Sequence, residues 1–258
     1  MKKYALITGA SQGLGKSFAY ELASRSINTI LVSLPNQNLK ELNQEITEKY
    51  KVDSQYFETD LSIIENVLSL TKFINENFDV TILINNAGLG GSNVFTEVSA
   101  TYINKIIQVN VMATSILTHQ LLPNLLKQSK GYILNVSSMA AFTPFSYKTV
   151  YPASKTFVYS FSRGLNEELK GTNVCVSVVN PGAMATNKNV TNRINKLGFL
   201  GKFTLLKPDK VAKKAINKLF KRHTVIIFNN LSWLLLQLLP IWIKLPILTK
   251  ILKKEITQ

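Results

Sequence analysis

Tyr151 and Lys155 are the residues whose types and spacing best suit chemistry. A tyrosine is a poor acid at neutral pH, with a reference pKa of about 10. A lysine four residues later on a helix lies on the same face, and we expect its positive charge to favour the phenolate and lower the tyrosine pKa. Ser138, thirteen residues before Tyr151, offers a hydroxyl that can hold a carbonyl oxygen beside the phenol. These roles suit reduction of a carbonyl or oxidation of an alcohol, provided that a hydride carrier binds nearby.

The N-terminal segment predicts where a hydride carrier binds. Residues 4–8 form a short apolar run typical of a strand, and residues 16–24 have apolar side chains at helical spacing. Gly9, Gly13 and Gly15 lie between them. Glycines permit a tight turn and close approach of a pyrophosphate, while the helix N-terminus offers free N–H groups and the positive end of the helix dipole. Strand, glycine turn and helix in this order predict a dinucleotide site.

The elements that must position these residues alternate along the chain of 258 residues. Seven strand candidates occur, with helical patterns between most of them, at residues 4–8, 28–33, 53–58, 80–84, 131–136, 173–179 and 224–228. This alternation predicts an α/β fold: a single doubly wound (Rossmann) domain with a seven-stranded parallel sheet flanked by helices. Long helices are expected at about residues 100–127 and 152–170. We assign residues 1–230 to a dinucleotide-binding catalytic domain and residues 231–258 to a basic, apolar C-terminal extension of the same domain.

Six motifs occur in order: Thr8-Gly-x3-Gly-x-Gly15, Asn85-Asn-Ala-Gly88, Asn110, Ser138, Tyr151-Pro-Ala-Ser-Lys155 and Pro181-Gly-Ala-Met-Ala-Thr186. Their order and spacing, from about residue 4 to about residue 228, resemble those of the short-chain dehydrogenase/reductase family. The pattern is similar to the branch of 3-ketoacyl reductases and hydroxysteroid-type dehydrogenases. The resemblance implies an NAD(P)-dependent enzyme that reduces a carbonyl, or oxidises a secondary alcohol, with Tyr151 as general acid/base. The alternative is a catalytically idle NAD(P)-binding scaffold or redox sensor at a membrane surface, against which the intact Ser138, Tyr151 and Lys155 argue.

The resemblance also implies individual roles. Asn110 resembles a residue that holds a water in the proton relay, Lys155 one that binds the ribose hydroxyls, and Thr186 one that contacts the carboxamide. Asp60 and Leu61 match the family's adenine-contacting position. The implied cofactor-binding residues are Gly9, Ser11, Gly13, Leu14, Gly15, Ser33, Asp60, Leu61, Asn86, Ala87, Gly88, Tyr151, Lys155, Pro181, Gly182, Met184 and Thr186. The two long helices resemble the family's usual dimer interface, which implies a homodimer or homotetramer.

The segment after the second strand bears on the choice between NAD and NADP, because the ribose 2′ position is bound there. An NAD-preferring relative usually carries an acid near Ser33, and none is present. An NADP-preferring relative usually carries arginine near Leu34 or a basic residue at Gln12, and both are missing too. Without the acid, a 2′-phosphate meets no repulsion, and Ser33 and Asn36 offer hydrogen bonds. We therefore predict that NADP(H) is preferred and that NAD(H) remains possible.

Apolar residues near the predicted chemistry bear on the substrate. Phe142 and Phe145 lie beyond Ser138, where the pocket wall is expected, so we predict substrate contacts at Ser138, Phe142 and Phe145. Apolar side chains also recur in residues 187–206, where the family typically has a substrate loop. An apolar lining suits a ketone or alcohol on a lipid-, acyl- or steroid-like body. The alternative is that these residues pack among themselves as core or dimer contact.

The C-terminal segment combines apolar and basic residues. Residues 187–258 contain 15 Lys and Arg against 2 Asp and Glu, and residues 225–243 carry no charge. Three interpretations stay open: a transmembrane helix, an interfacial helix on an anionic membrane surface, and a soluble lid or oligomer contact. A nucleic-acid partner is not expected, because the basic residues alternate with aliphatic ones and no known nucleic-acid motif occurs.

Cysteine and histidine usage narrow the compartment and the chemistry. Cys175 is the only cysteine, so no disulfide forms within the chain, which fits a reducing compartment. We therefore expect a cytoplasmic protein, and the C-terminal segment leaves peripheral association with a membrane open. The first strand begins at about residue 4, so we expect no cleavable signal peptide. His119 and His223 have no metal-ligand neighbours in the sequence, so we expect no metal site.

Overall fold

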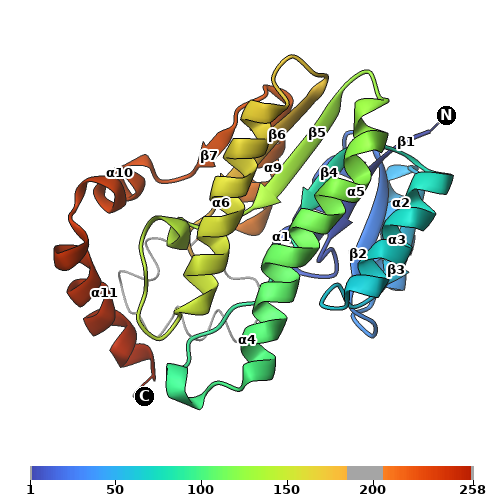
Figure 1. Ribbon diagram of the computed structural model, residues 1–258. Coiled ribbons are helices and arrows are strands. Elements are labelled where there is room, and N and C mark those ends of the chain that lie inside the picture. Colours follow the sequence, from blue (N-terminus) through green and yellow to red (C-terminus); the bar gives the residue numbers. More distant parts are fainter. Residues whose placement is uncertain (1, 185–205, 257–258) are drawn as a thin grey trace.

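The computed structural model describes residues 2–184 and 206–256. Within them, seven parallel strands form one sheet in the order β3-β2-β1-β4-β5-β6-β7 (Figure 1). The strands are β1 Lys3–Thr8, β2 Asn28–Ser33, β3 Ser54–Glu58, β4 Asp79–Asn85, β5 Gly131–Val136, β6 Val174–Asn180 and β7 Val225–Ile227. Each boundary lies within one residue of its predicted position. The order reverses between β1 and β4, and this is the switch point at which doubly wound sheets bind ligands. The predicted fold class is confirmed.

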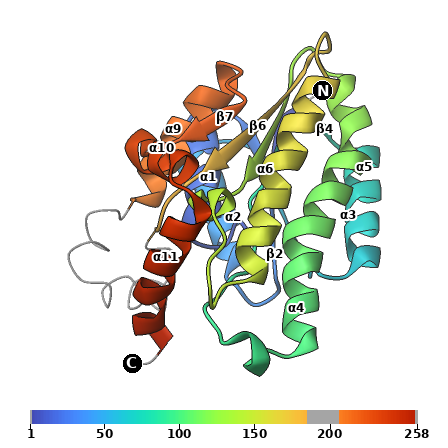
Figure 2. The same ribbon diagram turned by 60° about the vertical axis from the view of Figure 1, so that its left-hand side comes forward.

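Helices cover both faces of the sheet (Figures 1 and 2). On one face lie α1 Gly13–Ala23, α2 Leu39–Tyr50 and α9 Pro208–Phe220. On the other lie α3 Ile64–Asn77, α4 Ala100–Ile107, α5 Thr114–Leu126 and α6 Val150–Glu168. Both faces of the central strands are therefore buried, which explains why those strands are almost continuously apolar.

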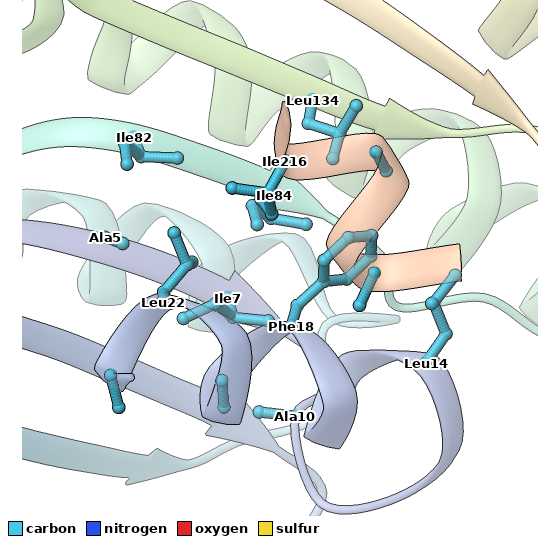
Figure 3. Packing of buried hydrophobic residues seen from close by; sticks show 14 of the residues in the cluster. Ala5, Ile7, Ala10, Leu14, Phe18, Leu22, Ile82, Ile84, Leu134 and Ile216 are labelled. Atoms are coloured by element: carbon cyan, nitrogen blue, oxygen red, sulfur yellow. The ribbon is translucent and has the colours of Figure 1, made fainter. Parts of the chain in front are cut away.

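The pleat of β1 divides its side chains between two cores. Ala5 and Ile7 belong to the cluster beneath α1 and α9, whereas Leu6 belongs to the cluster on the opposite face. Phe18 of α1 is fully buried beside Ile7, as Figure 3 shows. Because truncation of a buried Phe costs about 3–5 kcal/mol, this contact is a main anchor of α1 on the sheet. It fixes the glycine turn that precedes the helix.

The helix predicted over residues 100–127 is interrupted. A π-helical segment, η2 Gln108–Ala113, separates α4 from α5. The Ser99 hydroxyl caps α4 by accepting a 3.1 Å hydrogen bond from the Tyr102 N–H. Single π turns often occur at functional sites, and this one carries Asn110.

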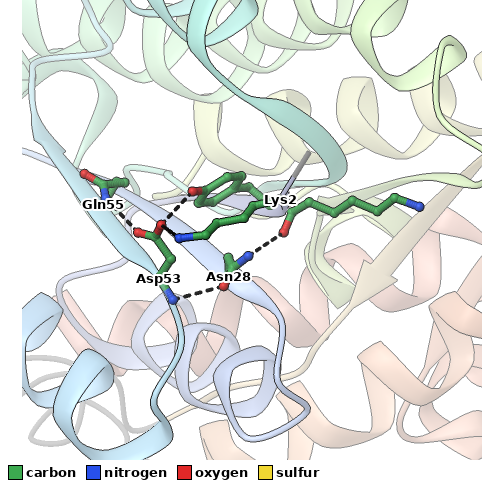
Figure 4. Close-up of polar contacts among 6 residues, drawn as sticks. Lys2, Asn28, Asp53 and Gln55 are labelled. Carbon is green, nitrogen blue, oxygen red and sulfur yellow. Dashed lines mark hydrogen bonds and ion pairs between the residues drawn. The ribbon is translucent and has the colours of Figure 1, made fainter.

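A polar cluster ties the amino ends of β1, β2 and β3 together (Figure 4). The Asp53 carboxylate accepts hydrogen bonds from Lys2 at 2.8 Å, the Tyr4 hydroxyl at 2.9 Å and the Gln55 amide at 2.8 Å. The Asp53 N–H donates to the Asn28 side chain at 2.9 Å. The hydrogen bond from Lys2 is the main reason that the Asp53 pKa is lowered. The cluster lies at the end of the sheet opposite the glycine turn.

Two helices end the described chain, α10 Asn230–Leu238 and α11 Ile241–Ile256. The charge-free run of residues 225–243 is therefore divided among β7, α10 and the first turn of α11. No helix in the described part of the chain combines the length and apolar composition needed to cross a membrane.

Candidate active site

The loop after β1 is shaped by glycine. Gly9 and Gly13 have φ values of 64° and 55°, in the left-handed region that favours glycine. A Cβ on Gly15 would lie 2.0 Å from the Gly9 carbonyl oxygen, so the start of α1 packs directly on the turn. No side chain caps the N-terminus of α1, and no acid lies in its first turn. Its free N–H groups are therefore suited to a phosphate, and the cradle fits a dinucleotide.

Hydrogen bonds lock the loops after β1 and β4 together. The Thr8 hydroxyl accepts from the N–H groups of Asn86 and Ala87, each at 3.0 Å. The Asn86 amide donates to the carbonyls of Thr8 at 2.9 Å and Gly9 at 3.2 Å. The two loops that flank the switch point thus behave as one rigid wall.

A cavity of about 840 Å³ opens along the carboxyl edge of the sheet. Seventeen predicted site residues line it: Gly9, Ser11, Gly13, Leu14, Ser33, Asp60, Leu61, Asn86, Ala87, Gly88, Ser138, Phe145, Tyr151, Lys155, Pro181, Gly182 and Met184. Gly15 and Asn110 lie behind the lining rather than in it. Thr186, and the predicted substrate loop as far as residue 205, lie outside the described residues. One elongated cavity therefore joins the glycine loop to Tyr151.

Three elements bring the predicted chemical groups together. Ser138 follows β5, and its hydroxyl accepts a 3.1 Å hydrogen bond from the Ala140 N–H while also bonding the Tyr151 side chain. Tyr151 and Lys155 lie one turn apart near the start of α6. The Lys155 ammonium lies 5.8 Å from the centre of the Tyr151 ring and donates to the Val136 carbonyl at 2.9 Å. A phenol, a hydroxyl and an ammonium thus meet at one end of the cavity.

Burial dominates the ionisation of this group. Loss of water raises the pKa of Tyr151, and the hydrogen bond with Ser138 acts weakly in the opposite direction. Burial likewise lowers the pKa of Lys155 from 10.5 to about 8. The Tyr151 pKa is therefore raised rather than lowered as the sequence predicted, because burial of the phenol is the largest influence on it. At neutral pH the phenol is protonated and Lys155 is still mostly charged.

Asn110 fixes the loop after β4 from beneath. Its side-chain oxygen accepts from the Leu89 N–H at 2.8 Å, and its amide donates to the Leu89 carbonyl and the Ser154 hydroxyl, each at 2.9 Å. A Cβ on Gly88 would lie 3.4 Å from the Asn110 oxygen and 3.3 Å from the Lys155 ammonium. Asn110 is thus next to Lys155, although every polar atom of its side chain is bound to protein.

Comparisons with known proteins decide the family. The family model described as short chain dehydrogenase matches residues 3–196. The chain belongs to the short-chain dehydrogenase/reductase family. Members of this family are oxidoreductases, and the chain is an NAD(P)-dependent enzyme that interconverts carbonyl and alcohol groups. The idle-scaffold alternative is not favoured.

Individual relatives agree with this assignment. The very-long-chain 3-oxoacyl-CoA reductase of Anas platyrhynchos is 36% identical over 200 residues, which cover 76% of this chain and 63% of that protein. The Macaca fascicularis protein of the same name is 32% identical over 254 residues, covering 95% of this chain and 78% of that one. A short-chain dehydrogenase from Sphingobium yanoikuyae, solved with NADPH, has a TM-score of 0.79 at 28% identity, covering 88% of this chain and 87% of that one.

One predicted substrate contact of this short-chain dehydrogenase/reductase lies elsewhere. Phe142 does not line the cavity, contrary to its predicted place in the pocket wall. It ends the short helix η3 Met139–Phe142, and its ring packs edge-on against Tyr159 at 5.0 Å and Trp233 at 6.3 Å. The turn of η3 directs it towards α6 and α10 instead, whereas Phe145 does reach the cavity.

Sequence reasoning missed several lining residues. Gly90 lies against the catalytic candidate, since a Cβ there would be 2.7 Å from Cδ2 of Tyr151. Lys105 and Lys148 bring further positive charge to the lining. The Gly90-Gly91 pair directly after the Asn85–Gly88 motif was an available signal for the first of these. No sequence pattern pointed to the two lysines, because their distance along the chain from the other motifs does not indicate that they lie near the cavity.

Asp60 is held by its neighbours. Burial acts to raise its pKa, but two hydrogen bonds from Ser62, at 2.9 and 2.7 Å, together with Lys105 at 3.4 Å, outweigh this, so the pKa is lowered. The carboxylate is therefore ionised at neutral pH. It lines the cavity next to Leu61.

Proposed function

We propose that this enzyme uses NADP(H) to interconvert a ketone and a secondary alcohol on an acyl- or steroid-like substrate, with Tyr151 as the general acid/base. The observation that supports this most is the meeting of Tyr151, Ser138 and Lys155 at one end of the cavity whose other end is the glycine loop. The nicotinamide cofactor supplies the hydride when bound. The residues of the chain hold the carbonyl and move the proton.

Each proposed role follows from the environment of the residue. Tyr151 is protonated at neutral pH because burial raises its pKa, so it can donate a proton to the oxygen of the developing alcohol. Ser138, already a hydrogen-bond partner of the phenol, holds that oxygen beside it. The charge of Lys155 stabilises the phenolate left behind, and its two remaining N–H donors are suited to ribose hydroxyls. Asn110 positions the loop at Leu89 and, as the resemblance implies, a relay water.

The preference for NADP is supported by the cavity end formed by Ser33, Leu34 and Gln37. No carboxylate belongs to that group of lining residues, so a 2′-phosphate meets no repulsion there. The structural relative from Sphingobium yanoikuyae was solved with NADPH. Fluorescence titration should show NADPH binding at least about tenfold tighter than NADH, which corresponds to about 1.4 kcal/mol.

A matched pair of variants tests this preference. Ser33→Asp should reverse it by repelling the 2′-phosphate, while Ser129→Asp adds the same charge at an exposed position before the amino end of β5 and should leave the preference in place. Tighter NADH than NADPH binding by the unmodified protein would contradict the assignment.

The substrate assignment is supported by the apolar side chains beside Tyr151, which include Leu89, Met139 and Phe145. The relatives named as very-long-chain 3-oxoacyl-CoA reductases point to a 3-oxoacyl thioester. If the apolar wall binds the acyl chain, kcat/KM should rise with chain length across a series of 3-oxoacyl thioesters. A flat or falling series would exclude an acyl substrate and favour a compact ketone.

We also propose that the protein forms a homodimer or homotetramer through α5 and α6. Phe157 on α6 is 39% exposed and stacks on Phe161 at 5.8 Å, which leaves an aromatic surface on this helix. Phe157→Glu should reduce the sedimentation coefficient to that of a monomer, and an unchanged value would place the interface elsewhere. The basic C-terminal extension, residues 231–258, is proposed to belong to the same domain and to meet an anionic membrane surface from the cytoplasm.

A further inference from the structure

Exposed apolar side chains gather on α10, α11 and the turn between them. Leu231, Leu238 and Trp242 are 68%, 70% and 73% exposed, above every other exposed large hydrophobic residue in the described part of the chain. Their exposed apolar neighbours are Leu234, Leu235, Leu239, Ile241 and Ile247. We call these eight residues the apolar face. Exposed apolar side chains concentrated in one part of the chain mark a site of association.

The part of the chain that carries the apolar face is strongly positive. The sequence contains no Asp or Glu from Lys210 to Lys254. Lys250 and Lys253 are exposed on α11. Four lysines of α9 and Lys221 directly after it line a surface hollow, namely Lys210, Lys213, Lys214, Lys218 and Lys221. Lys214 lies 4.8 Å above the ring of Phe228, which connects α9 to the segment leading into α10. Leucine and tryptophan beside lysines suit the headgroup region of an anionic bilayer.

Other residues of α10 and α11, outside the apolar face, contact the wall of the active-site cavity. Trp233 packs on Phe142, Lys244 donates to the Phe142 carbonyl at 3.4 Å, and Thr249 shares a 2.7 Å hydrogen bond with Ser146. Both ribbon views show α11 running beside the segment that enters α6 (Figures 1 and 2). The same segment, residues 139–149, lines the cavity through Met139, Ala140, Phe145 and Lys148. Residues 139–149 therefore lie between the C-terminal helices and the cavity in which the substrate is proposed to bind.

We propose that the apolar face docks on an anionic lipid surface and that this docking acts through residues 139–149 to raise turnover of apolar substrates at the membrane. The inference deepens the proposed function and rests on it for the substrate, but the docking itself rests only on α10 and α11. Neither helix crosses the bilayer, because both are too short or too charged. The helices lie in the plane of the interface instead.

Vesicle flotation with the full chain tests the docking. Wild type should bind phosphatidylcholine vesicles that contain phosphatidylglycerol, bind pure phosphatidylcholine less, and lose affinity as salt rises. Leu238→Glu with Trp242→Glu should weaken binding by about tenfold or more. Phe73→Glu with Phe95→Glu, at exposed apolar positions on other elements, should bind as wild type does. Equal vesicle binding by the two double variants would overturn the proposal. So would a wild-type protein that does not bind vesicles and forms a dimer that only Leu238→Glu with Trp242→Glu dissociates.

Turnover with NADPH tests the coupling. Vesicles should raise turnover of a long-chain 3-oxoacyl thioester several-fold and leave that of a small water-soluble ketone unchanged. Thr249→Val removes the hydrogen bond to Ser146 and leaves all eight residues of the apolar face unchanged, so this variant should bind vesicles normally and lose the stimulation. Stimulation that survives in Thr249→Val and in Lys244→Met, or is absent in wild type, would overturn the coupling. Absence of turnover with every ketone would count against the proposed function instead, and flotation would still decide the docking.

Discussion

The two ends of the sheet hold a charged side chain in opposite ways, paired and partly exposed at one end, buried and unpaired with any described carboxylate at the other. At the amino end, Asp53 is paired with Lys2 and hydrogen-bonded by Tyr4 and Gln55, and its pKa is lowered. At the carboxyl end, Lys155 is buried, and among the described residues no carboxylate contacts it, so its pKa falls to about 8. The first arrangement stabilises the fold. The second costs stability and keeps a reactive group available, as is typical of functional sites.

The largest expected effect comes from comparing a tyrosine at each end of the sheet, Tyr151 at the carboxyl end and Tyr4 at the amino end. Tyr151→Phe removes the proton donor, so turnover should fall at least about a hundredfold while NADPH affinity changes less than about twofold. Tyr4→Phe removes the hydrogen bond to Asp53 and should cost about 1 kcal/mol of stability with normal turnover. Steady-state kinetics, cofactor titration and urea unfolding of both variants check this. Turnover retained by Tyr151→Phe would contradict the proposed mechanism.

A pair of glycines sharpens the comparison at the carboxyl end. A Cβ on Gly90 would press on the Tyr151 ring, so Gly90→Ala should lower kcat about tenfold or more. Gly164 on α6 has nothing within 4 Å of such a Cβ, so Gly164→Ala should raise stability by about 0.5–1 kcal/mol. Both variants should still bind NADPH. Normal kcat in Gly90→Ala would mean that the ring has room to move.

Lys155→Met tests whether the buried cation costs stability. Near pH 7 the free energy of unfolding of the variant should exceed that of wild type by about 1–3 kcal/mol, reduced by the contribution of the lost hydrogen bond to Val136. The variant should be inactive. The unfolded state keeps the lysine proton to about pH 10.5, whereas the folded state releases it near pH 8. The unfolded state therefore binds more protons than the folded state between these two pH values, so the stability of wild type rises with pH in this range. The difference in stability between the variant and wild type should therefore narrow. Chemical denaturation at pH 7 and pH 10 measures this, and a gap that widens would contradict it.

The smallest expected effect lies at the amino end. Asp53→Asn should cost about 1 kcal/mol at neutral pH and leave turnover unchanged. Because the folded-state pKa of Asp53 is lowered, its contribution is present above the ordinary value of 3.8 and is lost as the pH falls through the folded-state pKa. Wild type and variant should therefore converge in acid. Loss of turnover in Asp53→Asn would show that the two ends are coupled.

The sequence predicted the sheet because parallel strands buried on both faces are apolar runs with sharp ends, and every strand boundary was within one residue. The glycine loop and the Tyr151–Lys155 pair could also be predicted, because residues at these spacings lie close together on a turn or on one face of a helix. The approach of Gly90 to Tyr151 was not, because it joins a loop and a helix far apart in the chain. Nor was the direction of the Tyr151 pKa, which depends on burial rather than on spacing. Phe142 was misplaced because the pattern shows no sign of the η3 turn.

The most direct test of the central claim is deuterium transfer from NADPH labelled at nicotinamide C4. Wild type should transfer the label from one of the two C4 positions to the carbonyl carbon of a 3-oxoacyl thioester, as detected by mass spectrometry of the alcohol. Tyr151→Phe should bind the labelled cofactor and give almost no labelled product. An unlabelled alcohol from wild type, or equal labelling by Tyr151→Phe, would contradict the assignment of the carboxyl edge as the site of reduction.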